Sequence, residues 1–143
     1  MLTVKKPDNF HSDFQAVGCF VEVQGSILQL LRTKISRGGP LKWGSPGGKI
    51  EPGESAEMAM VRELKEEIGL AVSERQLQRF PAQFVVYPDC AFEYAPFKLV
   101  FPFRPEIALS HEHIAYVWLP VMHLESLALM QDQFESTKLV YQF

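Results

Sequence analysis

The sequence predicts a single α/β domain of the α+β type, an α/β/α sandwich with a mixed, curved β-sheet between helices. Three observations lead to this prediction. The 143 residues are a common size for one domain, which we expect to span 1–143. The content of 47% hydrophobic and 22% charged residues is ordinary for a globular protein. Strand-like and helix-like segments alternate irregularly along the chain, which favours a mixed sheet packed between helices.

The N-terminal part of the chain predicts a hairpin after a weakly patterned start. Residues 1–14 are polar, and we expect them to be loosely ordered. The apolar run 16–23 is typical of a strand, Gln24-Gly25-Ser26 of a tight turn, and 27–32 of a returning strand. Glycines, a proline and several cations then indicate a loop over 33–45.

The middle of the chain predicts a helix from Ala56 to Ile68. Ser55 suits the N-cap of this helix, and Gly69 suits the left-handed position that ends it. Apolar residues recur every four positions and form a stripe that faces the core. They are Met60, Leu64 and Ile68.

The second half of the chain predicts three more strands and a helical end. Residues 82–87 and 97–103 are rich in valine and aromatic side chains, and Pro102 favours a sheet edge or a bulge for the second of them. Residues 114–119 are a further strand candidate. Pro120 then opens a helical region, and another helix is expected near the C-terminus.

Charge and cysteine content exclude several classes of protein. A net charge of −3 argues against binding of long nucleic acid through a basic surface. No apolar run has membrane-spanning length and the N-terminus lacks a signal-peptide core, so we expect a soluble, cytoplasmic protein. Cys19 lies in an apolar run and resembles a buried hydrophobe, and the two cysteines are not expected to form a disulfide.

Glu63, Glu66 and Glu67 lie on one face of the predicted helix. Their spacing of i, i+3 and i+4 places them within an arc of about 100°. Like charges this close repel each other, and a hard divalent cation such as Mg²⁺ would relieve the repulsion. Taken alone, the three residues are more typical of a solvated acidic face than of a metal site, because glutamate is a common residue in helices. Glu57 projects toward the apolar side and is not expected to be a ligand.

A longer pattern around this helix decides between these interpretations. Its fixed positions, in order, are Gly48, Glu54, Arg62, Glu63, Leu64, Glu66, Glu67, Gly69 and Leu70, preceded by the Gly/Pro segment 43–47. This segment, Gly48–Leu70, resembles the signature of the Nudix (MutT-like) hydrolase family at every fixed position. Such a match is expected by chance less than about once in 10⁸ starting points. It covers 23 of the 143 residues.

The resemblance implies a Nudix-like fold and a metal site on the loop and helix of the signature. Glu63, Glu66 and Glu67 would be metal ligands and catalytic residues, with the backbone carbonyl of Gly47 completing the protein ligands. Arg62 would orient a carboxylate. Three residues are assigned structural roles, of which Glu54 would act through Arg62: Gly48, Glu54 and Gly69. The implied cofactor is Mg²⁺, with Mn²⁺ as a substitute.

Family members often place one further glutamate outside the signature, for metal binding or as the general base. Glu112 is the best match, as a ligand and as a catalytic residue, because it lies in a loop just before a predicted strand. Glu93 and Glu106 are weaker rivals. His111 and His113 flank Glu112, but two histidines without a third ligand rarely bind zinc. They are candidates for phosphate contacts, or they are loop residues without a role.

Four residues are predicted to bind substrate: Arg32, Lys34, Trp43 and Tyr87. The two cations belong to a basic cluster before the signature that could steer phosphates toward it; a solvated basic loop is the alternative. Aromatic side chains could stack on a base, although most aromatics in strands belong to the core. These candidates are Trp43, Phe84, Tyr87, Phe92 and Tyr94.

The resemblance therefore implies an enzyme that acts on acid anhydrides in phosphorus-containing compounds. We expect metal-activated water to cleave a phosphoanhydride bond of a nucleoside diphosphate linked to another group. A nucleoside triphosphate or dinucleoside polyphosphate is the leading substrate. The alternative is a catalytically silent nucleotide-binding or regulatory protein with the same fold. The partner is a small-molecule nucleotide, neither long nucleic acid nor a membrane is expected, and a homodimer is left open.

Overall fold

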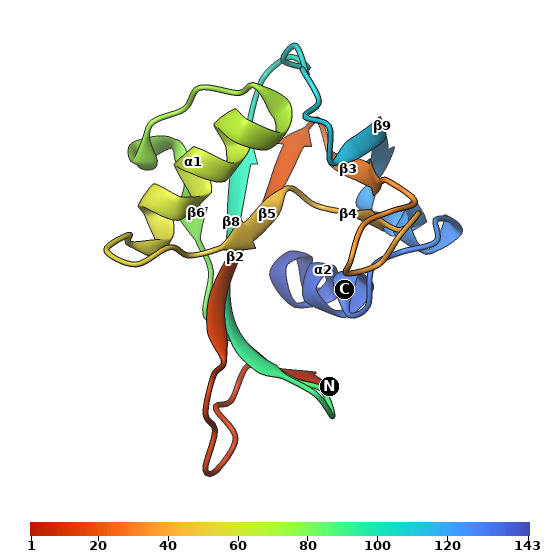
Figure 1. Cartoon of the computed structure of the whole chain (residues 1–143). Helices are drawn as coiled ribbons and strands as arrows, with labels where there is room; N and C mark the ends of the chain where they lie inside the picture. Colours follow the sequence, from red (N-terminus) through yellow and green to blue (C-terminus); the bar gives the residue numbers. More distant parts are fainter.

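A computed structural model describes the whole chain, residues 1–143. One sheet of nine strands carries α1 (Ala56–Ile68) on one face, with η2 (Val121–Ser126) and α2 (Gln133–Tyr141) on the other (Figure 1). The strands are β1 (Leu2–Thr3), β2 (Phe14–Val23), β3 (Ser26–Arg32), β4 (Trp43–Gly44), β5 (Gly47–Lys49), β6 (Gln78–Arg79), β7 (Gln83–Val86), β8 (Ala91–Val100) and β9 (His113–Pro120), and a short helix η1 (Glu74–Gln76) follows α1. The predicted α/β/α architecture is confirmed.

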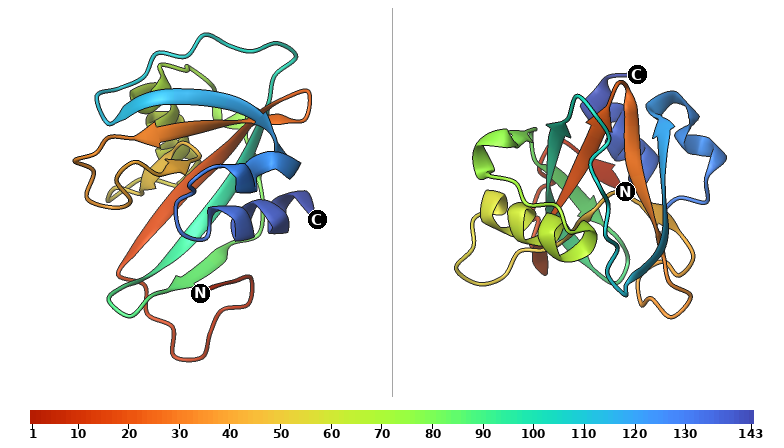
Figure 2. Two further views of the ribbon diagram at one scale, coloured as in Figure 1. Left: turned by 90° about the vertical axis from the view of Figure 1, so that its right-hand side faces the viewer. Right: turned by 90° about the horizontal axis from the view of Figure 1, so that it is seen from above.

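Strands β2 and β8 form the centre of the sheet. They run parallel and stay in register from the Phe14–Phe92 pair to the Glu22–Val100 pair, whereas every other pairing is antiparallel. The other edge of β2 pairs with β5 in its first half and with β3 at its end. Because β3 pairs with β2 only next to the hairpin turn and then pairs with β4 and β9, it diverges from β2 and the mixed sheet opens on that side (Figure 2).

Alternation along β2 supplies both core layers. Val17, Cys19 and Val21 pack on one face against the apolar stripe of α1. Phe20 points to the opposite face, where it joins Leu124 of η2 and Val140 of α2. The predicted apolar stripe is confirmed, since Met60, Leu64 and Ile68 are all fully buried. Both cysteines are free thiols, and Cys19 is buried.

Helix α1 begins and ends where the sequence predicts. The Ser55 hydroxyl accepts a hydrogen bond from the Met58 backbone N–H at 3.0 Å, which satisfies one unpaired amide at the N-terminus. Gly69 has a φ of 70° and donates its N–H to the carbonyls of the last turn. This left-handed conformation is easy for glycine and ends the helix.

The structure corrects the strand predicted over 97–103. Strand β8 starts at Ala91, ends at Val100, and lies between β2 and β7, so it is interior and not an edge strand. Pro102 follows the end of the strand, where it removes no hydrogen bond from the sheet. The first half of β8 was missed because long-range pairing with β2 and β7, and not its own weak alternation, makes it a strand.

The two ends of the chain lie against the rest of the fold. Leu2 and Thr3 pair with β7, and the terminal ammonium donates to the Val86 carbonyl at 2.9 Å, whereas residues 4–13 form no helix or strand and are mostly exposed. The helical region predicted after Pro120 is the 3-10 helix η2, and the expected C-terminal helix is α2. None of the helices combines the length and the apolar character needed to cross a membrane.

Candidate active site

The acidic face of α1 divides into an exposed and a buried part. Glu66 keeps 59% of its side chain exposed, whereas Glu63 and Glu67 expose only 13% and 7%. The three side chains share a helix face as predicted. Glu63 and Glu67, however, turn toward β5 and the loop that precedes α1. Of the three predicted metal ligands, Glu63 and Glu67 are thus largely buried and Glu66 is exposed to solvent.

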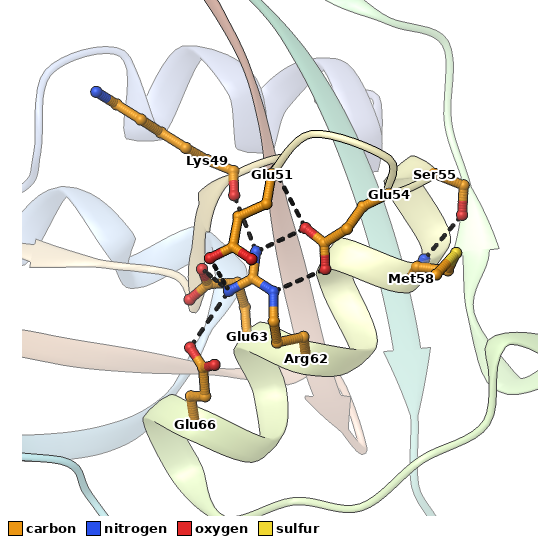
Figure 3. Close-up of polar contacts among 8 residues, drawn as sticks. All are labelled: Lys49, Glu51, Glu54, Ser55, Met58, Arg62, Glu63 and Glu66. Carbon is orange, nitrogen blue, oxygen red and sulfur yellow. Dashed lines mark hydrogen bonds and ion pairs between the residues drawn. The ribbon is translucent and has the colours of Figure 1, made fainter.

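Arg62 binds three carboxylates, the covered Glu54 and Glu63 and the exposed Glu66 (Figure 3). Its Nε and Nη2 donate to the two carboxylate oxygens of Glu54 at 2.8 and 2.9 Å, while Nη1 donates to Glu63 at 2.9 Å and to Glu66 at 3.3 Å. Nη2 also donates to the Lys49 carbonyl at 3.1 Å. The hydrogen bonds from Arg62 lower the pKa of Glu54 to about 2. The guanidinium therefore fixes the orientation of three carboxylates at once.

Glu67 lies in a different environment. Its Oε1 accepts a hydrogen bond from the Gly47 N–H at 2.7 Å, and its Oε2 lies 3.8 Å from Nε2 of His113. Burial raises the pKa of Glu67 to about 8, with further contributions from the charges of Glu63 and Glu112, although the Gly47 hydrogen bond opposes the shift. Glu67 thus has a desolvated carboxyl group without a hydrogen bond from any cationic side chain.

Two glycines allow β5 to approach these carboxylates. Hydrogen bonds from Cys19 to Pro46 and from Ile50 to Gln15 put Gly47 at a non-hydrogen-bonded position of the ladder, so its N–H and carbonyl face away from β2. The N–H reaches Glu67 and the carbonyl lies on the same edge. A side chain at Gly48 would collide with the Glu63 carboxylate.

The carboxylates of α1 have the chemistry of a site for a divalent cation. Glu63, Glu66 and Glu67 each use one oxygen in a hydrogen bond and keep the other oxygen free. Burial also raises the pKa of Glu63, so negative charge is under-compensated here. No three groups converge on a common point in the structure. Free carboxylate oxygens beside uncompensated charge nevertheless fit a hard cation such as Mg²⁺.

The turn before β9 brings a further acid and a histidine to this end of the fold. Glu112 is exposed, and its charge contributes to the raised pKa values of Glu63 and Glu67, so it lies within electrostatic range of both. His113 is buried, its Nδ1 has no hydrogen-bond partner, and burial lowers its pKa. No local pattern distinguishes His113 from His111, which is exposed. His113 is buried because β9, which it begins, pairs with β3.

A cavity of about 400 Å³ begins at these groups. Glu67, His113 and Arg32 line one part of it. Aromatic side chains and the segment before α2 line the rest, which includes Phe14, Tyr87, Phe92, Tyr94 and residues 130–133. A carboxyl group and the Arg32 guanidinium in one part of the lining, with aromatic rings in the other, suit a phosphorylated aromatic ligand.

The structure separates the four predicted substrate-binding residues. Arg32 lines the cavity, held by a hydrogen bond from its Nε to the Ser36 hydroxyl at 2.8 Å. Tyr87 also lines it, and its hydroxyl donates to Asp132 at 2.7 Å. Lys34 is exposed and, like Trp43, is not part of the lining.

Comparison with known proteins identifies the family. The family model for the NUDIX domain matches residues 13–140. The chain belongs to the NUDIX family. Membership confirms the predicted class of enzyme, a hydrolase that acts on pyrophosphate bonds.

Three similar proteins illustrate the range of the family. Dihydroneopterin triphosphate diphosphatase of Escherichia coli (strain K12) is 34% identical over 106 residues, which are 65% of this chain and 67% of that protein. CTP pyrophosphohydrolase of the same organism is 43% identical over 56 residues, 39% of this chain and 41% of that protein. A bifunctional NMN adenylyltransferase/ADP ribose pyrophosphatase from Francisella tularensis, complexed with AMP and a Mn ion, aligns with a TM-score of 0.76 and 23% identity over 94% of this chain and 42% of that one.

Proposed function

We propose that this NUDIX hydrolase cleaves a nucleoside triphosphate or a closely similar heterocyclic triphosphate, with Mg²⁺ as its cofactor and Mn²⁺ as a substitute. Water attacks the phosphoanhydride, and the products are the monophosphate and pyrophosphate. The observation that carries the proposal is the single cavity that connects Glu67, His113 and Arg32 with an aromatic lining. A substrate with its triphosphate beside Glu67, His113 and Arg32 would place its heterocycle next to the aromatic rings of the lining.

The size of the cavity favours one heterocycle over two. Ligand pockets span roughly 300–1,000 Å³, so a volume of about 400 Å³ is near the lower limit. We therefore rank a triphosphate before a dinucleoside polyphosphate. The names of two relatives, a dihydroneopterin triphosphate diphosphatase and a CTP pyrophosphohydrolase, support the same choice and the release of pyrophosphate.

The residues of the acidic face have distinct roles in this proposal. Glu63, Glu66 and Glu67, with the Gly47 carbonyl, would hold the metal ion. When bound, Mg²⁺ neutralises phosphate charge and lowers the pKa of the attacking water. Glu67, whose pKa burial raises, would gain the most from a cation at this place.

Groups around the acidic face orient the ligands and accept the proton. Arg62, anchored by Glu54, keeps Glu63 and Glu66 in place. Glu112, whose charge acts on Glu63 and Glu67, would take a proton from water as general base or serve as a further ligand. Arg32 supplies positive charge to the phosphates from the wall of the cavity.

A substrate panel tests the proposal. Purified protein is incubated with GTP, CTP, ATP, dihydroneopterin triphosphate, diadenosine tetraphosphate and ADP-ribose, each with MgCl₂, with MnCl₂ or with EDTA. Phosphate and pyrophosphate are measured separately. We expect pyrophosphate from at least one triphosphate, only with metal. Faster turnover of diadenosine tetraphosphate or ADP-ribose than of any triphosphate would contradict the substrate assignment.

Glu67→Gln and Glu57→Gln form a matched pair for the same assay. The first removes a proposed ligand, and we expect turnover to fall by more than the roughly 100-fold typical of residues that only support a metal ligand. The second makes the same chemical change on the same helix, where Glu57 pairs with Arg79. It should leave turnover unchanged. Binding of nucleotides by the wild type without any hydrolysis would favour the silent, regulatory protein instead.

A further inference from the structure

Tyr94 lines the cavity together with the aromatic residues and Glu67, and it is near enough to Glu67 for the carboxylate to affect its pKa. It follows Phe92 on the same face of β8, and Phe92 stacks on Phe14 with ring centroids 4.8 Å apart. The Tyr94 hydroxyl lies over the Cα of Gly18, so that even a methyl side chain at that position would collide with it. Gly18 is in turn paired with Gly47, whose N–H binds Glu67. The hydroxyl therefore lies at the junction of the two parts of the cavity.

This hydroxyl makes no hydrogen bond within the protein. The hydroxyl groups of two other tyrosines do form hydrogen bonds: Tyr87 donates to Asp132 and Tyr141 donates to Glu22, both at 2.7 Å. The Tyr94 hydroxyl is also open to the cavity, since the only sealed side-chain polar atoms without a partner are Gln29 Oε1 and His113 Nδ1. The Tyr94 hydroxyl packs over Gly18 and its O–H donor has no partner, so this group is suited to contact a ligand.

The environment keeps this phenol protonated. Burial raises the pKa of Tyr94 well above its ordinary value, with smaller contributions from Cys19 and the Glu67 carboxylate. The hydroxyl therefore keeps its proton, and remains a hydrogen-bond donor, at neutral pH. A donor in a poorly solvated place binds an anionic oxygen more strongly than a neutral one.

We propose that the Tyr94 hydroxyl donates a hydrogen bond to a non-bridging oxygen of the phosphoryl group next to the sugar, the α-phosphoryl group of the substrate. This inference rests on the proposed function and adds a specificity residue to it. The contact fixes the distance between the stacked heterocycle and the phosphates at the carboxylates. Gly18 makes it available, because any larger residue would displace the ring of Tyr94.

Tyr94→Phe tests the contact without removing the ring. Because the hydroxyl has no partner within the protein, the melting temperature should stay at the wild-type value. The kcat/KM for the best triphosphate of the panel should fall by about tenfold or more, as expected for a lost hydrogen bond to a charged group. An unchanged kcat/KM would overturn the proposal while leaving the hydrolase assignment intact, whereas an inactive wild type would overturn the hydrolase assignment.

Calorimetric binding of products locates the contact independently of turnover. GMP, CMP and AMP are titrated into the wild type and Tyr94→Phe in MgCl₂, with guanosine, cytidine and adenosine in parallel. Affinity for the monophosphates should fall by about tenfold, whereas affinity for the nucleosides should not change. An equal loss for the nucleosides would move the contact to the sugar or the base and contradict the proposal. Wild-type binding to none of the monophosphates would contradict it as well.

Tyr141→Phe is the matched control. Its hydroxyl bonds to Glu22, and Tyr141 does not line the cavity. The opposite pattern is expected, a lower melting temperature with unchanged kcat/KM and product affinity. A lower melting temperature in Tyr94→Phe, without a kinetic effect, would make the Tyr94 hydroxyl structural and not a ligand contact.

Discussion

Glutamate carboxyl groups lie in opposite environments in two regions around helix α1. We call the region of Arg62 and Glu54 the Arg62 side, and the region of Glu67 the Glu67 side. On the Arg62 side, hydrogen bonds from the guanidinium lower the pKa of Glu54 to about 2. On the Glu67 side, burial raises the pKa of Glu67 to about 8, and the groups at hydrogen-bonding or near-contact distance are the Gly47 N–H and His113. Glu63 lies between them, bonded to Arg62 and yet with its pKa raised by burial.

This difference indicates which part of the site is complete in the chain and which part needs a ligand. The Arg62 side has its positive charge built in, so it is a rigid support. The Glu67 side leaves negative charge desolvated and under-compensated, a costly state unless a cation joins it. The largest functional effects are therefore expected on the Glu67 side, and smaller ones on the Arg62 side.

Glu112→Gln probes the Glu67 side. Its effect should be larger than those of Arg62→Lys and Glu54→Gln. As the general base, Glu112 would contribute about 100-fold or more to the rate. We expect such a fall in kcat and a changed pH–rate profile, measured with the best substrate of the panel. Glu106→Gln is the matched control, since Glu106 is an exposed glutamate of the same long connection. Rates equal to the wild type across pH would remove Glu112 from the mechanism.

Arg62→Lys tests the Arg62 side. Lysine keeps the charge but cannot reproduce the paired hydrogen bonds to Glu54 and the bonds to Glu63 and Glu66. We expect a loss of about tenfold in activity and a higher Mg²⁺ concentration at half-maximal rate, as for other residues that orient metal ligands. Arg79→Lys, on an exposed pair with Glu57, should change neither quantity. A loss larger than that of Glu112→Gln would reverse the ranking of the two sides.

Glu54→Gln should have the smallest effect, visible in the pH dependence of stability. A folded-state pKa of about 2, below the ordinary 4.5, means that this group stabilises the folded state above pH 4.5 and loses that contribution as the pH falls toward 2. The melting temperature of the variant should be lower than that of the wild type at pH 7, by a small amount because solvent screens the pair. The two should converge in acid. A constant difference from pH 7 to 2 would contradict this account.

Local features of the sequence were sufficient for α1 and for the residues of the signature. The bounds of α1, its Ser55 cap, its Gly69 end and its core stripe depend on contacts within about one helical turn, so spacing alone predicts them. The pairing of Arg62 with carboxylates on the same face follows for the same reason. The metal-binding and catalytic roles of the glutamates stay predictions that the proposed experiments test.

The sequence was less informative wherever distant segments meet. Spacing placed Glu66 and Glu67 on one face, but only the approach of β5 decided that Glu67 is buried and Glu66 is exposed. The strand that begins at Ala91 exists because β2 and β7 pair with it. In the same way, sheet pairing separates His113 from His111 in burial.

The sequence by itself thus determined the family, the bounds of helix α1 and the carboxylates that share one face of it. Tertiary structure alone decided the shape of the cavity, the inclusion of Arg32 and not Lys34 in its wall, and the position of the Tyr94 hydroxyl over Gly18. The physical reason is the range of the interactions. Helix periodicity and capping act over a few residues, whereas burial, and with it the charge state of a carboxylate or the reach of a phenol, depends on strands that meet only after the sheet has formed.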